Sequence, residues 1–186
     1  MGIGLIVTLV IAAVGVLVVI GMYNNLVRMR KQADNAWAQI DVQLKRRCDL
    51  IPNLVESVKG YAKHESGVFE RVTAARTRAM AVSGSGADRI AAETELSGAL
   101  KALNVQVEAY PELKANTSFL QLQEELSSTE NKISFARQHY NDSATNYNTA
   151  IAVFPANIIA GVFHFQDIPL WQITDPAERE VPKVSF

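Results

Sequence analysis

The sequence predicts an all-α protein: an N-terminal transmembrane helix, an elongated antiparallel bundle of about four helices, and an irregular apolar C-terminal tail. Three observations predict this fold. An apolar run opens the chain, apolar stripes of helical period follow it, and no stretch has the alternating pattern of a β-strand. We expect an anchor over residues 1–23, a helical bundle over 24–160 and an aromatic tail over 161–186.

The composition argues against several classes of protein. The 186 residues carry a formal net charge of −1, which gives no sign of a clustered basic surface, so we expect no nucleic-acid partner. The single cysteine excludes an internal disulfide and a cysteine-based zinc site. No glycine-rich phosphate loop or nucleophile elbow occurs in the sequence. We therefore expect neither a cofactor nor a bound metal.

Residues 3–22 form an almost unbroken apolar run, about as long as a helix needs to be to cross a bilayer. A cleaved signal peptide would have a basic start and a small-residue cleavage site, and since neither is present we expect a retained anchor. Arg28, Arg30 and Lys31 follow the run closely. The positive-inside rule then places the bundle on the cytoplasmic side of the membrane.

The first bundle helix is predicted over residues 23–64. Its apolar residues share one stripe, and they are Ala33, Trp37, Ile40, Leu44, Cys48, Ile51, Val55, Val58 and Ala62. The stripe keeps its phase across Pro52, although a proline inside a helix costs about 3 kcal/mol. We therefore expect a continuous helix kinked at Pro52. The carbonyl of Cys48 would be left for water or for an Asn or Arg side chain.

Cys48 itself has two interpretations. A thiolate activated by Arg46 and Arg47 would make it a reactive group, because neighbouring positive charge lowers the pKa of a cysteine. A free cysteine is also one of the residues most often buried in a core. Its position between Leu44 and Ile51 on the apolar stripe favours the core.

Three further helices are expected. The small, flexible segment at residues 83–88 separates a helix over about 67–82 from a third helix that ends near Tyr110. The last helix has the most regular pattern, with apolar residues seven apart at Phe119, Leu126, Ile133, Tyr140, Tyr147 and Phe154. About five heptads correspond to a helix of roughly 55 Å.

Charged residues beside the apolar stripes predict a polar layer between the helices. We hypothesise that Arg47, Glu130 and Arg137 join in partly buried ion pairs that fix the register of the first and last helices. The alternative is that they are solvated charges on the helix flanks. Asn141 and Asn148 each follow a tyrosine of the heptad pattern, and we expect them to extend the same margin.

The tail is apolar and aromatic but is interrupted by Gly161 and Pro169, so it is too short and broken for a second membrane span. We predict that the segment from Phe163 to Trp171 contacts other subunits or partner proteins. The residues expected to make these contacts are Phe163, Phe165, Trp171 and Phe186. The alternative is that the tail folds back on its own bundle.

Three segments of the chain resemble the LemA family of bacterial membrane proteins. They are residues 23–65, beginning YNNLVRMRKQADNAW; residues 130–165, beginning ENKISFARQHYNDSA; and the closing PKVSF. The resemblance implies one N-terminal helix in the bacterial inner membrane and a cytoplasmic antiparallel bundle. It implies no established enzymatic activity or cofactor. Some members of the family shape specialised membranes, and others are encoded near membrane proteases. Cys48 stands where the family more often has an aromatic residue.

These observations favour a non-enzymatic scaffold that is anchored in the bilayer through residues 3–22. We expect a homo-oligomer, with other membrane proteins such as a protease as possible partners. The alternative is a membrane-shaping oligomer, which tubulation of anionic liposomes would distinguish. An enzyme is least expected, because no nucleophile, base and orienting group can be assembled from the sequence.

Overall fold

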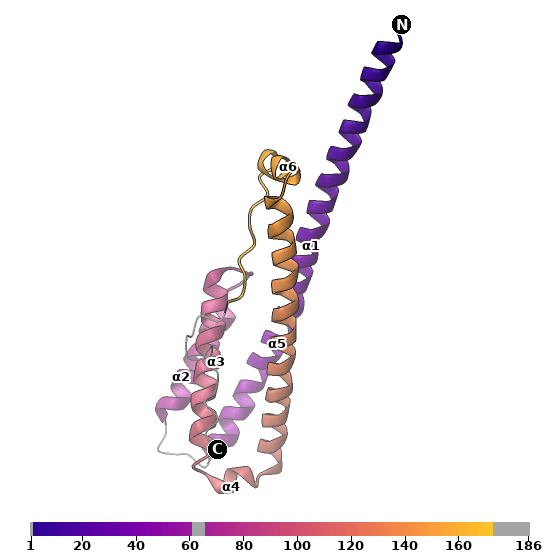
Figure 1. The fold of residues 1–186 in the computed structure, drawn as a ribbon. Helices are drawn as coiled ribbons and strands as arrows, with labels where there is room; N and C mark the ends of the chain where they lie inside the picture. The colour runs from indigo at the N-terminus through magenta and orange to yellow at the C-terminus, as the bar shows by residue number, and fades with distance from the viewer. Residues whose placement is uncertain (1, 61–65, 173–186) are drawn as a thin grey trace, which may run out of the picture.

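The computed structural model describes residues 2–60 and 66–172, and within these ranges it contains helices and connecting segments but no strand (Figure 1). The all-α prediction is therefore confirmed. The elements, in chain order, are α1 (Ile3–Lys59), α2 (Ser66–Ala81), α3 (Ala87–Val107), α4 (Pro111–Lys114), α5 (Thr117–Ala152) and α6 (Ala156–Val162).

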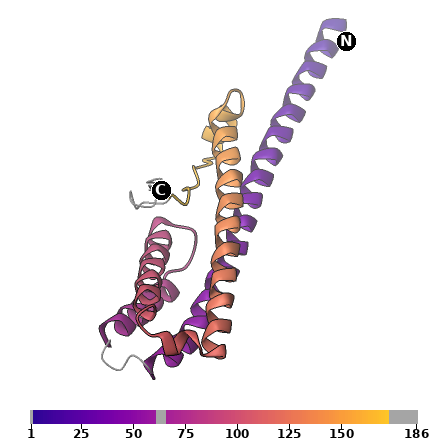
Figure 2. The same ribbon diagram turned by 60° about the horizontal axis from the view of Figure 1, so that its bottom comes forward.

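Helix α1 joins the predicted anchor and the first bundle helix without a break. It has 57 residues, which corresponds to about 85 Å, and it continues through Pro52. Its N-terminal part projects beyond the rest of the molecule (Figures 1 and 2), and every side chain from Gly2 to Gly21 is exposed. Within the described residues, α1 alone is long and apolar enough to span a membrane.

The bundle is built around the antiparallel pair α1 and α5, which lie side by side in Figures 1 and 2. Helices α2 and α3 form a hairpin that covers only the half of this pair farther from the N-terminus. The core of that half joins all four helices, through residues such as Val55, Val72, Leu96 and Leu126. Nearer the N-terminus the third partner is the segment after α6, which runs back along α5 (Figure 1).

Helix α5 is capped at its N-terminus by Asn116, whose side chain accepts hydrogen bonds from the backbone N–H groups of Ser118 and Phe119. The first five positions of the predicted heptad pattern are buried, and they are Phe119, Leu126, Ile133, Tyr140 and Tyr147. Phe154 was predicted to be the sixth and this was wrong, since α5 ends at Ala152 and Phe154 is 78% exposed. The residue before a proline disfavours helical geometry, and Pro155 follows Phe154 directly.

Candidate functional site: a buried charge cluster, a clasped tail and an exposed face

The Arg47 side chain lies at the centre of a charge cluster between α1, α3 and α5. It is 1% exposed, and its Nη1 donates to Glu130 Oε1 at 2.7 Å and to Ser97 Oγ at 2.9 Å. Its Nη2 lies 2.5 Å from Glu93 Oε2. The guanidinium therefore links α1 to both α3 and α5.

Glu93 connects Arg47 to a second arginine. The Glu93 carboxylate is fully buried, and its Oε1 lies 3.0 Å from Arg89 Nε, at an orientation that makes the contact electrostatic rather than a hydrogen bond. Arg89 also pairs with Asp41 at 3.1 Å and donates to the carbonyls of Ala79 and Val82. The cluster thus has a buried centre and two ends, Asp41 and Glu130, that reach solvent.

The charge on Arg47 is secured by its partners. Burial is the largest single influence and by itself would lower the Arg47 pKa. The charges and hydrogen bonds of Glu130 and Glu93 outweigh it and raise the pKa above its ordinary value. A buried ion pair of this kind specifies which helices meet more than it adds to the free energy of unfolding.

The structure brings together two of the three residues that were predicted to form this layer. Arg47 meets Glu130, whereas Arg137 lies about two turns farther along α5 and places its guanidinium 4.7 Å from the centre of the Trp171 ring. Arg89 and Glu93 were missed, although both lie in phase with the stripe through Leu96 on α3. Charged residues on an apolar stripe are the signal that would have identified them.

Pro52 is accommodated by an arginine from the hairpin. A proline has no N–H to donate to the carbonyl four residues earlier, which here is that of Cys48. Arg76 Nε of α2 donates to this carbonyl at 2.8 Å. The side-chain partner expected for the Cys48 carbonyl is therefore Arg76.

The Cys48 thiol shows no sign of activation. The side chain is 3% exposed and lies in the core of the far half of the bundle. Burial, with a smaller contribution from Glu93, raises the pKa of the thiol, and the nearby arginines do not offset this. The described residues also contain no group of three or more side chains placed to hold a metal ion. Cys48 acts here as a packing residue.

The tail segment is held against α5 by two repeats of the same device, a tyrosine followed by an asparagine. Tyr140 Oη donates to the carbonyl of Pro169 at 2.7 Å. The Asn141 side chain donates to the carbonyl of Trp171 at 2.9 Å and accepts from its N–H at 2.8 Å. The Asn141 amide therefore pairs with both backbone groups of Trp171, as the backbone of a neighbouring β-strand would.

One heptad later along α5 the same contacts recur. Tyr147 Oη donates to the carbonyl of Gln166 at 3.1 Å, and Asn148 pairs with both backbone groups of Ile168 at 2.9 Å. Seven helical residues rise about 10.5 Å, and three nearly extended residues cover about 10 Å. The helical and tail repeats therefore match, and the tail runs antiparallel to α5. Asn141 and Asn148 bind the tail and do not extend the Arg47 cluster.

Trp171 packs into the buried cluster that includes Trp37 of α1 and Tyr140 of α5. It is 4% exposed, its ring centre lies 5.5 Å from that of Trp37, and Trp37 contacts Tyr140 edge-on at 5.2 Å. The prediction that Trp171 contacts another subunit is therefore corrected, because its ring is buried in the core of its own bundle, in one cluster with Trp37 of α1 and Ile90 of α3.

Two other predicted contact residues lie near α1. Phe165 lies 5.7 Å from the ring of Tyr23. Phe163 also touches Tyr23, at 4.8 Å, but stays 52% exposed. The alternative that the tail folds back on its own bundle therefore holds for the segment up to Gln172. Phe186 lies outside the described residues.

The described residues leave one face of the α1 and α5 pair uncovered. Phe135 is 74% exposed and Val42 is 63% exposed, and they border a shallow hollow of about 440 Å³. Polar residues surround the apolar pair, and they are Gln39, Gln43, Lys132 and His139. The Oε1 atom of Gln43 is buried at this hollow and has no hydrogen-bond partner among the described residues. We call this surface the Phe135 face.

Comparison with known proteins places the chain in a family, since residues 36–186 match the model of the LemA family. The chain belongs to the LemA family. It is 27% identical over 158 residues to Protein LemA of Metamycoplasma hominis, covering 85% of this chain and 72% of that protein. The family and the exposed apolar part of α1 indicate a bacterial membrane protein.

More distant relatives of this LemA-family chain are magnetosome proteins. It is 24% identical over 175 residues to Magnetosome protein MamQ 2 of Paramagnetospirillum magneticum, covering 81% of this chain and 64% of that protein. It is 23% identical over 171 residues to Magnetosome protein MamQ of Magnetospirillum gryphiswaldense, covering 78% and 63%. The chain thus spans less than two thirds of these two relatives. None of the three names states an enzymatic activity.

Proposed function

We propose that this LemA-family protein is a membrane-anchored helical scaffold that assembles with copies of itself through the Phe135 face. The anchor is the part of α1 over residues 3–22, and the bundle stands on the cytoplasmic side of the bacterial inner membrane. Arg28, Arg30 and Lys31 directly after the span support this orientation, because basic residues remain in the cytoplasm.

The continuity of α1 favours a scaffold. The same helix contains the apolar span and continues to the far end of the bundle, with no linker between the span and the bundle. The height of every bundle residue above the bilayer is therefore set by its position along α1 and α5. A scaffold that assembles with anchored copies of itself can use this fixed height to bring matching surfaces together.

The Phe135 face is the observation that carries the proposal. A large aromatic ring that is 74% exposed beside an exposed valine is apolar surface that association would remove from water. Copies anchored in one bilayer carry this face at the same height, so like faces can meet in an isologous contact, the commonest arrangement in homo-oligomers.

Photo-crosslinking in native membranes tests the proposal. A photoreactive phenylalanine analogue at position 135 is compared with the same analogue at position 105, because Val105 is also an exposed apolar residue but lies on α3. We expect position 135 to give a product of twice the monomer mass and position 105 to give none. Products of other masses at position 135 would point to a different protein partner, and equal yields at both positions would contradict the proposal.

A further inference from the structure

Exposed apolar side chains gather where α5 turns into α6. The large ones are Val153, Phe154, Ile158, Val162 and Phe163, and all are at least half exposed. From Ser143 to Gln166 the sequence contains no Asp, Glu, Lys or Arg. We call the residues from Val153 to Phe163 the α6 corner. Apolar patches of this kind mark surfaces that bind something other than water.

The inner side of the α6 corner fixes its place along α1. Ile159 and Ala160 are buried against Leu26, and Met22 and Tyr23 pack on the same cluster. The Tyr23 ring lies 4.8 Å from that of Phe163 and 5.7 Å from that of Phe165. These contacts involve the last residue of the apolar span, Met22, and the first turn after it. Figure 1 shows α6 beside α1 where its free N-terminal part begins.

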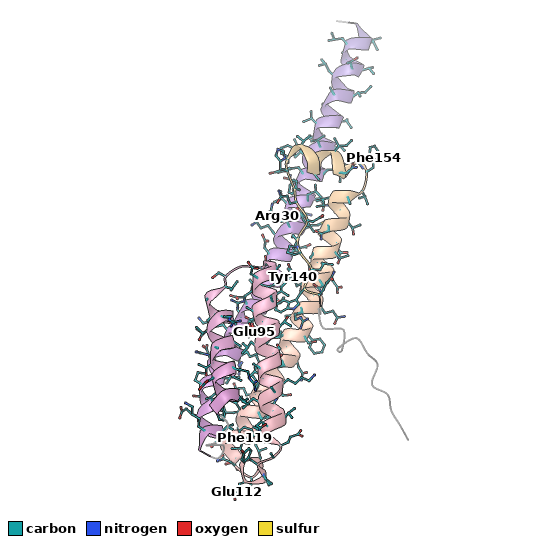
Figure 3. The ribbon with its side chains drawn as sticks, turned by 90° about the vertical axis from the view of Figure 1, so that its left-hand side faces the viewer. Arg30, Glu95, Glu112, Phe119, Tyr140 and Phe154 are labelled. Atoms are coloured by element: carbon teal, nitrogen blue, oxygen red, sulfur yellow. The ribbon has the colours of Figure 1, made fainter. Side chains whose placement is uncertain are left out.

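The position of the span then determines what the outer side of the α6 corner meets. Twenty residues from Ile3 to Met22 rise about 30 Å, which equals the thickness of the hydrocarbon core. The α6 corner therefore lies at the level where the acyl chains of the lipids meet their headgroups. Figure 3 labels Phe154 at this end of the bundle. Aromatic residues are enriched at this level in membrane proteins. The exposed cations Arg28 and Arg30 lie on the next turns of α1, where phosphate groups would meet them.

We propose that the α6 corner is a second membrane contact, in which Phe154, Ile158 and Val162 insert into the interface of the same bilayer that α1 spans. The occupant of this surface is lipid, because it continues directly from the membrane-spanning part of α1 and carries no charge. The contact would hold the bundle at two points and so fix its angle to the membrane. The inference rests on the membrane anchoring proposed above.

Quenching of tryptophan fluorescence by brominated lipid tests this contact in the full-length protein. Phe154→Trp places an indole in the corner, and Val105→Trp is the control, because Val105 is also exposed, at 65%, but lies on α3 and outside the Phe135 face. Each variant is reconstituted in vesicles with and without bromine on the upper acyl chains. The wild-type signal, from the buried Trp37 and Trp171, is subtracted.

An interfacial side chain sits about 5–10 Å into the headgroup boundary, so brominated lipid should remove about half or more of the emission added by Phe154→Trp. The emission added by Val105→Trp should be unchanged. No quenching at position 154, in protein that still resists alkaline extraction from the vesicles, would overturn the lipid contact while leaving the anchor intact. Protein that is extracted by alkali would refute the anchor itself.

Two further outcomes would also overturn the contact. A blue-shifted Phe154→Trp emission without bromine quenching would mean that protein, such as a second copy, covers the corner. Equal quenching at positions 154 and 105 would mean that the bundle lies flat on the membrane. Circular dichroism of both variants should match the wild type, since both replaced side chains are exposed.

Discussion

Replacing Arg47 tests whether the buried charge cluster holds the helices together as the distances indicate. Arg47→Met removes the cation that lies 2.5 Å from Glu93, whose side chain is completely buried. Breaking a buried ion pair on one side costs about 3–5 kcal/mol of unfolding free energy, and the lower end applies because Arg89 remains 3.0 Å from Glu93. For a chain of this length, about 3 kcal/mol lowers the melting temperature by roughly 6–12 °C.

Two companion variants test whether the lost stability comes from the unpaired charge of Glu93. Glu130→Ala should cost no more than about 1 kcal/mol, because the Glu130 side chain is 41% exposed and solvent screens its pairing. Arg47→Met combined with Glu93→Leu should recover most of the lost stability, because the buried Glu93 carboxylate is then removed and Arg89 keeps its pairing with Asp41. The assay is thermal unfolding in detergent, followed by circular dichroism.

Two results would refute this reasoning. In one, Arg47→Met is no more destabilising than Glu130→Ala, which would mean that the centre of the cluster is hydrated. In the other, the double variant is as unstable as Arg47→Met alone, which would mean that the arginine acts through its packing and not through its charge.

Three other predictions concern the proline, the tail and alkaline pH. Arg76→Ala should lower the free energy of unfolding by about 1.5 kcal/mol in the wild type. The loss should be clearly smaller in the Pro52→Ala background, because residue 52 then has a backbone N–H that can reach the Cys48 carbonyl. Additive losses in denaturant unfolding would contradict this. Asn141→Ala should speed hydrogen exchange of the Trp171 amide by about tenfold, as expected for a lost bond of about 1.4 kcal/mol, whereas the exposed control Asn146→Ala should not. Burial, and to a smaller extent Asp34, raises the pKa of Tyr140 to about 12 from 10.0. The stability from neutral Tyr140 is complete below pH 10 and lost as pH rises towards 12, so the Tyr140→Phe variant should lose less stability than wild type over this interval. Equal losses in the two proteins would refute the assignment.

The helical architecture was accessible from the sequence because each helix buries one apolar stripe, and stripes are periodic. The heptad from Phe119 to Tyr147 is buried as its spacing predicted. The pattern failed at Phe154, where the seven-residue spacing persists but the helix does not. Periodicity reports which residues share a face and cannot report where a helix ends, for which Pro155 was the better indicator.

The polar contacts were less predictable because they depend on elements that the sequence does not place relative to one another. Glu130 was identified as a neighbour of Arg47 since both flank long stripes, but the buried Glu93 comes from the hairpin. Asn141 and Asn148 were predicted to extend the polar layer, but their partners are backbone groups of the tail. Backbone groups are the same at every residue, so no sequence pattern could have revealed that pairing.

Size analysis of the protein extracted from membranes in mild detergent tests the scaffold proposal most directly. The wild type should migrate as an assembly of at least two copies of the 20.4 kDa chain. Phe135→Glu should migrate as a single copy with unchanged helical content, because the replaced ring is exposed and a charge there opposes an isologous contact. A wild-type protein that migrates as a single copy, or a Phe135→Glu variant that assembles as the wild type does, would contradict self-assembly through the Phe135 face.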